Sequence, residues 1–341
     1  MGTSSIAPDV SERIRVLRYA MILGIVVLHM PPHQSLEQLD NTGFDLLKGF
    51  LSHGVFRATT PVLTAIAGFL LFRSGLDMNP AKLLRSKSNS LVVPLLVFNL
   101  PLVVLLYFLQ SWNGGTAGYR VDLTDPTWTV WANATFGLFD APVNYPTNFL
   151  RDLFVLCLLA PQLGMLLRNL PWIGLVAVAV VALTGMEGKL ILRDTMLINF
   201  YVGGMAALWV DDLKALDRYG HALLAVFLLW CLAIPAFNLA NRTIFVLCAP
   251  LLIWPAVSVV MGSAPARWLA RNSSASFFTF LTHGPLLLVV HNLQKSVLGQ
   301  SFAGAAGLAL PICTAAFCLL AYRLLSAHAP AIGYALGEKP A

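Results

Sequence analysis

The sequence predicts an all-α integral membrane protein, a bundle of about ten transmembrane helices. Of its 341 residues, 57% are hydrophobic and 11% are charged, whereas soluble domains carry roughly 25% charged residues. Several uninterrupted apolar runs reach the roughly 20 residues that cross ~30 Å of hydrocarbon. A helix satisfies its backbone groups within one segment inside a bilayer, so each of these runs is expected to be helical.

The apolar runs leave no room for a separate soluble domain. Residues 1–341 are therefore expected to form one transmembrane domain, with short tails at 1–12 and 326–341. The first run is too long for a signal peptide and lacks a small-residue cleavage site, which predicts a retained span. The predicted spans are residues 13–30, 52–73, 90–110, 149–168, 171–187, 191–210, 220–239, 242–261, 274–293 and 303–325.

The basic residues predict the orientation of this bundle. If the N-terminus is cytoplasmic, most of the 22 Lys and Arg residues fall on the inner side, as the positive-inside rule requires. Both termini are then expected in the cytoplasm. The formal net charge of +6 therefore reflects topology, because the basic residues form no aromatic-interleaved patch of the kind that binds nucleic acid.

Cysteine chemistry is not expected. The five cysteines lie inside apolar runs and lack metal-ligand spacing. They are expected to be small packing residues, and neither disulfides nor a metal site is predicted.

One face of the first span carries two ionisable side chains. Arg18 precedes His29 by eleven residues, which in an α-helix is roughly 20° past three full turns and about 16 Å along the axis. A charge inside a span costs several kcal/mol unless a polar cavity or a function explains it. The spacing suits an extended coenzyme A thioester, with a phosphate near Arg18 and the thioester carbonyl near His29. The alternative is that Arg18 snorkels to the headgroups and His29 caps the span.

A second candidate site lies where the second span begins. His53 and Arg57 are four residues apart, so they are neighbours if this segment is helical, and Pro61 leaves a backbone carbonyl free. This positive pair could bind an anion or an acyl carbonyl. Equally, Arg57 could anchor the span at the interface.

Two more places put polar groups where they are costly. Arg151 and Asp152 are neighbours at the outer end of the fourth span. They either bind a substrate or form an ion pair. His283 lies roughly ten residues into a span that begins near Ser274, where it either takes part in chemistry or hydrogen-bonds a facing helix.

Two connections between spans complete the pattern. The inner loop 76–90 contains Lys82 and Arg85, which form a solvated positive-inside loop or, with Arg18, a basic mouth for the phosphates of a nucleotide-bearing donor. The long outer connection 111–148 is rich in Trp, Tyr and Pro. Its aromatic residues either anchor the protein at the headgroup level or contact a carbohydrate.

In their order and spacing these motifs resemble the acyltransferase-3 family of membrane O-acyltransferases, from the first span to about residue 325. The motifs that carry the resemblance are Arg18 to His29, Phe56-Arg57 to Pro61, Ala67-Gly68-Phe69-Leu70-Leu71, Lys82-Leu-Leu-Arg85 to Pro94, Phe149-Leu-Arg-Asp-Leu153 and Phe280-Leu-Thr-His283-Gly-Pro285. The chain departs from the family pattern at Arg15, Tyr19, Ala67 and Asn148. These departures indicate a divergent branch similar to the exopolysaccharide or glucan acyltransferases, including succinyl-transferring members.

The resemblance implies an enzyme of the bacterial inner membrane that moves an acetyl or succinyl group from cytoplasmic acyl-CoA to a hydroxyl of a cell-surface or periplasmic glycan. The implied partners are acyl-CoA, as donor substrate with no tightly bound cofactor and no metal, and a glycan or lipid-linked oligosaccharide as acceptor. His29 is the expected general base, or carries a covalent acyl group. The expected site comprises catalytic His29, Arg57 and His283, donor-binding Arg18, Lys82 and Arg85, and substrate-binding His53, Arg151 and Asp152.

A transporter or flippase of a lipid-linked sugar or small anion is the alternative from another class, because it also needs intramembrane charges and a central cavity. Binding of acyl-CoA separates the two hypotheses, since a transporter is not expected to be stabilised by a coenzyme A thioester. A membrane sensor or scaffold is the third and weakest hypothesis, because the chain shows no soluble effector domain.

Overall fold

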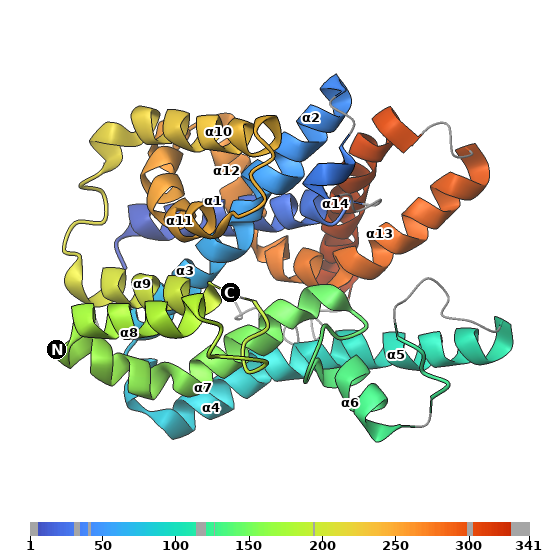
Figure 1. The fold of residues 1–341 in the computed structure, drawn as a ribbon, viewed down its shortest axis with the longest axis horizontal. Coiled ribbons are helices and arrows are strands. Elements are labelled where there is room, and N and C mark those ends of the chain that lie inside the picture. The colour runs from blue at the N-terminus through green and yellow to red at the C-terminus, as the bar shows by residue number, and fades with distance from the viewer. Residues whose placement is uncertain are drawn as a thin grey trace.

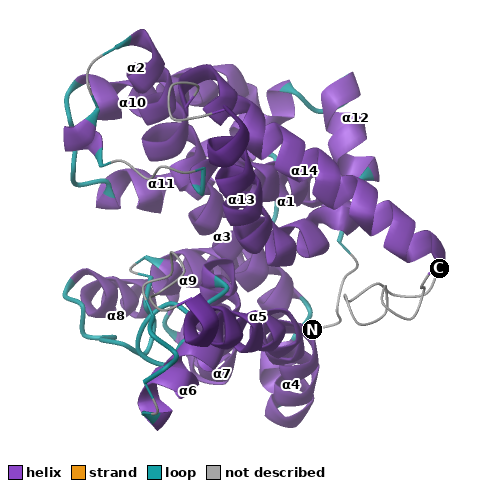
Figure 2. Ribbon diagram, turned by 90° about the vertical axis from the view of Figure 1, so that its right-hand side faces the viewer, coloured by secondary structure: helices purple, strands orange, loops and turns teal. Residues whose placement is uncertain are grey.

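The computed structural model describes residues 6–30, 35–39, 42–113, 121–125, 127–193, 195–298 and 303–328, and these residues form helices and no strands (Figures 1 and 2). The α-helices are α1 Pro8–Leu28, α2 Gly43–Gly49, α3 Thr59–Arg73, α4 Pro80–Lys87, α5 Val93–Asn113, α6 Trp128–Phe136, α7 Asn148–Asn169, α8 Pro171–Leu183, α9 Met196–Trp209, α10 Gly220–Ala236, α11 Thr243–Ala256, α12 Ala264–Arg271, α13 Ser276–Leu298 and α14 Ala303–His328. Short 3₁₀ and π helices join them: η1 Leu36–Gln38, η2 Phe50–Gly54, η3 Val55–Ala58, η4 Leu76–Met78, η5 Ser88–Val92, η6 Tyr145–Thr147, η7 Asp217–Tyr219, η8 Val257–Val259 and η9 Ser273–Ala275.

Every predicted span coincides with a helix, but not every helix is long enough to cross a bilayer alone. Among the described residues, six helices are long and apolar enough by length and composition, or seven if the bent pair Thr243–Val259 and Ala264–Arg271 forms one broken span. Helices α8 and α9 have 13 and 14 residues, fewer than the roughly 20 that span ~30 Å. The count of about ten crossings and the cytoplasmic termini stay predictions.

The bundle has two halves with α3 between them. Figures 1 and 2 show α4 to α9 on one side of α3, and α1 with α10 to α14 on the other. Helix α1 packs against α3, α12, α13 and α14. The cavity beside the C-terminal end of α1 is lined from both halves, by Arg193 and Met196 on one side and by Arg242 and Val246 on the other.

Helices α3 and α9 approach each other at glycines. A Cβ atom at Gly68 would lie 2.1 Å from the carbonyl oxygen of Phe200, and one at Gly203 would lie 2.0 Å from that of Ala65. Small residues allow the backbones of membrane helices to come this close, where van der Waals packing stabilises the pair. Gly68 belongs to the motif that the sequence analysis singled out in the second span.

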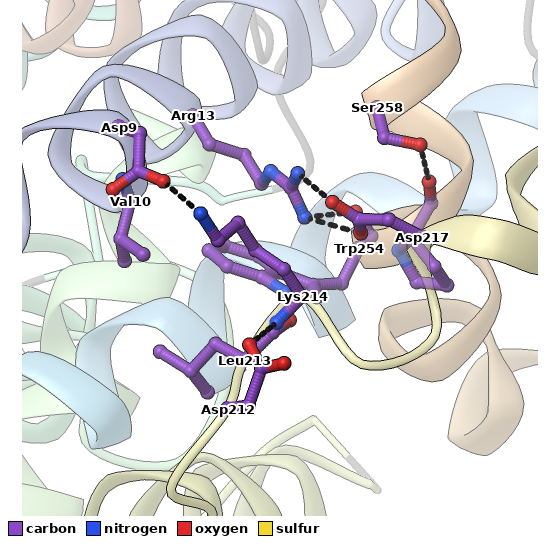
Figure 3. Close-up of polar contacts among 10 residues, drawn as sticks. Asp9, Val10, Arg13, Asp212, Leu213, Lys214, Asp217, Trp254 and Ser258 are labelled. Carbon is purple, nitrogen blue, oxygen red and sulfur yellow. Dashed lines mark hydrogen bonds and ion pairs between the residues drawn. The ribbon is translucent and has the colours of Figure 1, made fainter.

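A polar network holds the first turns of α1 to the segment between α9 and α11 (Figure 3). The buried Arg13 makes a bidentate ion pair with Asp217, at 2.5 and 2.9 Å, and its guanidinium lies 5.0 Å from the ring centre of Trp254. Nearby, Lys214 pairs with Asp9 at 2.5 Å, and the hydrogen bond that it donates lowers the pKa of the Asp9 carboxyl. The network fixes the end of α1 that is distant from His29.

The predicted outer connection 111–148 is more structured than expected. Helix α5 continues to Asn113, and the connection contains α6 and η6. Asn99 of α5 donates to the carbonyls of Ala134 and Thr135 and accepts from the backbone of Asn144 at 2.7 Å. Buried amide groups thus tie this segment to α5. Residues 114–120 and 126 lie outside the described residues.

The two predicted tails differ from expectation in the same way. Helix α1 begins at Pro8, inside the predicted tail 1–12, and α14 ends at His328. Residues 1–5 and 329–341 lie outside the described residues.

Candidate active site

A single face of α1 lines two neighbouring cavities. Arg18 and Ile22 line a cavity of about 170 Å³, and Ile25 and His29 line a larger one of about 440 Å³. The spacing of these four residues is that of one helix face. Phe280 lines both cavities, so a path along α1 from Arg18 to His29 passes this ring.

His29, at the C-terminal end of α1, is hydrogen-bonded to His283 of α13. The distance between His29 Nδ1 and His283 Nε2 is 3.1 Å, and the distance between His283 Nδ1 and the carbonyl oxygen of Thr279 is also 3.1 Å. His283 is fully buried, whereas His29 faces the larger cavity. The edge of the Tyr145 ring packs against His29, with the ring centres 4.7 Å apart.

The carbonyl of Thr279 determines how the protons are arranged in this pair. A carbonyl oxygen only accepts, so His283 Nδ1 carries a proton and donates it. In a neutral imidazole the second nitrogen is then an acceptor, so His283 Nε2 accepts from His29 Nδ1. The unprotonated nitrogen of a neutral His29 is consequently Nε2, which is the atom able to take a proton from a substrate.

Three arginines line the same cavity as His29. They are Arg57 from η3, Arg193 from the segment before α9 and Arg242 at the start of α11. Arg193 lies close enough to Arg57 and Asp152 to interact with both charges, and Arg242 likewise interacts with Arg57. No Asp or Glu is found among the described residues that line the cavity. Asp194 lies outside the described residues.

The family can now be assigned, because the acyltransferase-3 model, described as an acyltransferase domain, matches residues 11–323. The chain belongs to the acyltransferase-3 family. This confirms the resemblance found in the sequence, and the matched range contains both cavities of this acyltransferase. No solved structure matches the chain.

One curated relative of this acyltransferase is the succinoglycan biosynthesis protein ExoH of Rhizobium meliloti (strain 1021). The two proteins are 31% identical over 295 residues, which cover 82% of this chain and 80% of ExoH. The similarity extends over nearly the whole membrane domain. It agrees with the branch of the family that the sequence departures indicate.

The structure brings together the predicted catalytic residues of the acyltransferase. His29 and His283 form the pair described above, and Arg57 lines the cavity beside them. Arg18 lines the smaller cavity, where it donates to Ser276 Oγ at 3.3 Å. The catalytic and donor-binding roles of these residues stay predictions, now with a shared location.

Lys82 and Arg85, the other predicted donor-binding residues, lie apart from both cavities. They are exposed on α4 and line none of the cavities described above. They could contact only a part of the donor that lies outside the two cavities. Their donor-binding role also stays a prediction.

The predicted substrate-binding residues do not line the cavity, but His53 and Asp152 hydrogen-bond residues that do, Arg242 and Leu192. His53 Nδ1 lies 2.7 Å from Arg242 Nη1, so His53 positions an arginine that lines the cavity. Arg151 donates to Asp152, at 2.7 Å, and to the carbonyls of Leu138, Lys189 and Leu190. Asp152 also accepts from the backbone of Leu192 at 3.2 Å. The Arg151–Asp152 pair thereby fastens the segment that carries Arg193 to α7, and direct substrate binding by the pair stays a prediction.

Arg193 and Arg242 were missed by the sequence analysis. Both lie at the outer ends of predicted spans, and the sequence analysis gave neither residue a role. A signal was nevertheless present, since arginines on the outer side run against the positive-inside rule. Three such residues at span ends favour an anionic site over three separate anchors.

In the parts of the chain that the structure describes, no group of three or more His, Cys, Asp or Glu side chains could hold a metal ion. The five cysteines are free thiols. Cys157, Cys231 and Cys318 are buried, as the predicted packing role requires, whereas Cys248 is half-buried and Cys313 is exposed.

Proposed function

We propose that this protein is an acyl-CoA-dependent O-acyltransferase that acylates a hydroxyl of an exopolysaccharide or its lipid-linked precursor. Family membership supports acyl transfer, and similarity to a succinoglycan biosynthesis protein supports an exopolysaccharide acceptor. The proposal places the donor on the cytoplasmic side at Arg18 and the acceptor on the opposite side at His29. The transferred group is an acetyl or a succinyl group.

The observation that carries the proposal is the hydrogen bond between the buried His283 and His29, which lines a cavity. The hydrogen bond leaves Nε2 as the basic nitrogen of His29, a residue that lines the cavity in which we propose that the hydroxyl and the thioester meet. Arg18 lies about 16 Å away on the same face of α1, a distance that an extended pantetheine arm spans. The basic nitrogen and the phosphate-binding cation thus lie at the two ends of one path.

In the proposed reaction, His29 Nε2 removes the proton from the acceptor hydroxyl as its oxygen attacks the thioester carbonyl carbon. The C–O bond forms, the C–S bond breaks, and the imidazolium returns the proton to the departing coenzyme A thiolate. Positioned general bases contribute roughly 10²- to 10⁴-fold to such steps. Arg57 lines the same cavity, where its guanidinium would stabilise the oxyanion that develops on the carbonyl.

The decisive test replaces His29. In a strain that lacks the protein, the wild-type chain and His29→Ala are expressed at equal levels, and the acyl content of the surface polysaccharide is measured by mass spectrometry. The wild type is expected to restore acylation, and His29→Ala is expected to lose it by roughly 10²-fold or more. Normal acylation by His29→Ala would contradict the proposed base.

A second measurement separates transfer from transport. The melting temperature of the purified protein is measured with and without acetyl-CoA or succinyl-CoA. In a separate assay, release of free coenzyme A thiol is followed in the presence of extracted polysaccharide. An acyltransferase is expected to be stabilised by a thioester and to release the thiol. A transporter of a lipid-linked sugar would do neither.

A further inference from the structure

The larger cavity combines a catalytic histidine with an unusual excess of positive charge. Arg57, Arg193 and Arg242 line it, and no carboxylate of the described residues lies among them. Each guanidinium keeps its charge, because arginine does not lose its proton in proteins. Like charges held together in an enclosed space repel one another, so this arrangement favours an anionic ligand that bridges them.

One carboxylate among the described residues, Asp152, interacts with the charge of Arg193. Its Oδ1 accepts from Arg151 and from the backbone of Leu192, whereas its buried Oδ2 accepts no hydrogen bond from the described residues. Arg242 contacts His53, which adds no negative charge. Among the described residues, one carboxylate outside the cavity lining therefore offsets part of the charge of the three guanidinium groups, and a net positive charge remains on the cavity wall.

The direction of the donor decides which substrate group meets these arginines. A thioester whose carbonyl lies at His29, and whose pantetheine arm runs along α1 toward Arg18, directs its acyl chain away from Arg18. That direction leads into the larger cavity. An acyl group with a second, free carboxylate would place this carboxylate among guanidinium groups, which bind carboxylates by paired, charge-assisted hydrogen bonds.

We infer that Arg193 and Arg242, together with Arg57, select a dicarboxylic acyl donor by binding its free carboxylate. This inference rests on the proposed function and narrows it, since acetyl-CoA lacks the group that the arginines recognise. Arg193 and Arg242 act as specificity-determining residues and His29 remains the base.

The test compares two donors of equal chain length, succinyl-CoA and butyryl-CoA, which differ in whether a carboxylate or a methyl group ends the acyl chain. The rate at which purified protein transfers the acyl group of each donor is measured, with exopolysaccharide from a strain that lacks the protein as acceptor. The variants are Arg193→Met, Arg242→Met and Arg242→Lys. Lys189→Met is the matched control, because it also removes a cation near this segment but not from the cavity wall.

Hydrogen bonds to charged groups typically change binding by roughly 10- to 100-fold. The wild type and Lys189→Met are therefore expected to prefer succinyl-CoA over butyryl-CoA by at least about tenfold in kcat/KM. Each Met variant is expected to reduce this preference by about tenfold while its transfer of butyryl groups persists, and Arg242→Lys is expected to retain part of it. Persisting butyryl transfer shows that a variant is folded.

Two results would overturn the inference alone. One is transfer by the wild type with no preference between the two donors. The other is a loss of kcat/KM in the Met variants that is equal for both donors and disappears when the carboxylates of the acceptor polysaccharide are chemically reduced. That result would mean that the arginines bind the acceptor. If the wild type consumes neither thioester, the proposed function fails and this inference with it.

Discussion

At the scale of single residues, His283 defines the direction in which His29 acts. Its Nδ1 donates to the carbonyl of Thr279 and its Nε2 accepts from His29, so the basic nitrogen of His29, which lines the cavity, is Nε2. Because His283 is buried and is not among the residues that line the cavity, we expect it to act as a positioning residue. The sequence analysis placed it among the catalytic residues because its depth alone gave no indication of its partner.

Replacing His283 tests this positioning role. His283→Leu removes the acceptor for His29 Nδ1 and is expected to lower kcat by about 10²-fold with little change in KM for acyl-CoA. His283→Asn keeps an acceptor oxygen and is expected to recover part of the loss. The measurement is the pH profile of kcat, in which the limb that belongs to the base should shift in the Leu variant and less in the Asn variant. Identical profiles in all three proteins would mean that His283 only fills space.

At the scale of elements, α1 carries the chemistry and the helices around it fix its position. One end of α1 is tied by the bidentate ion pair of Arg13 with Asp217, and the other end by the bond from His29 to His283. Helix α3 lines both cavities and is itself held against α9 by the close approach at Gly68 and Gly203. The shape of the cavity therefore depends on residues that never contact a substrate.

The α3–α9 contact leads to a stability prediction. Gly203→Ala places a methyl group against the backbone oxygen of Ala65, so the helices must separate, and overpacking of this kind costs about 1–3 kcal/mol. The melting temperature in detergent is expected to fall by several degrees. Gly43→Ala is the control, because a Cβ there meets nothing within 4 Å, and its melting temperature should stay at the wild-type value. Equal melting temperatures for both variants would show that the helices separate without cost.

At the scale of the whole molecule, the side of the membrane on which a loop lies depends on whether the short helices α8 and α9 cross the bilayer. If all predicted spans cross the bilayer, the turn between α8 and α9 lies on the outer side, with the segment that carries Arg193. If this pair does not cross, the turn lies on the same side as the end of α7. The location of Arg193 relative to the membrane depends on this difference.

Cysteine labelling distinguishes the two topologies. In a background whose five native cysteines are replaced by alanine, Met186→Cys is expected to react with a membrane-impermeant maleimide in intact cells. Met186 is well exposed in the turn, so access to the thiol does not limit the reaction. Asp140→Cys should behave alike, and Arg85→Cys should react only after the membrane is permeabilised. Labelling of Met186→Cys only after permeabilisation would contradict the crossing of α8 and α9.

The sequence was sufficient for the features that depend on neighbouring residues. Apolar runs predicted the helices, because hydrocarbon admits only backbones that satisfy their own hydrogen bonds. The spacing of Arg18 and His29 predicted a shared face, because the pitch of an α-helix is fixed. The motifs along the chain were sufficient to indicate the acyltransferase-3 family.

Only the tertiary structure decided which of the polar residues meet. His29 and His283 are 254 residues apart in the chain, and the arginines at 57, 193 and 242 come from three separate segments. Hydrogen bonds and charge interactions act over a few ångströms of space, whatever the separation in sequence. The helix face from Arg18 to His29 was therefore predictable from the sequence. The partner that orients His29 and the arginines that line its cavity became visible only when α13 and the segments that carry these arginines were placed beside the end of α1.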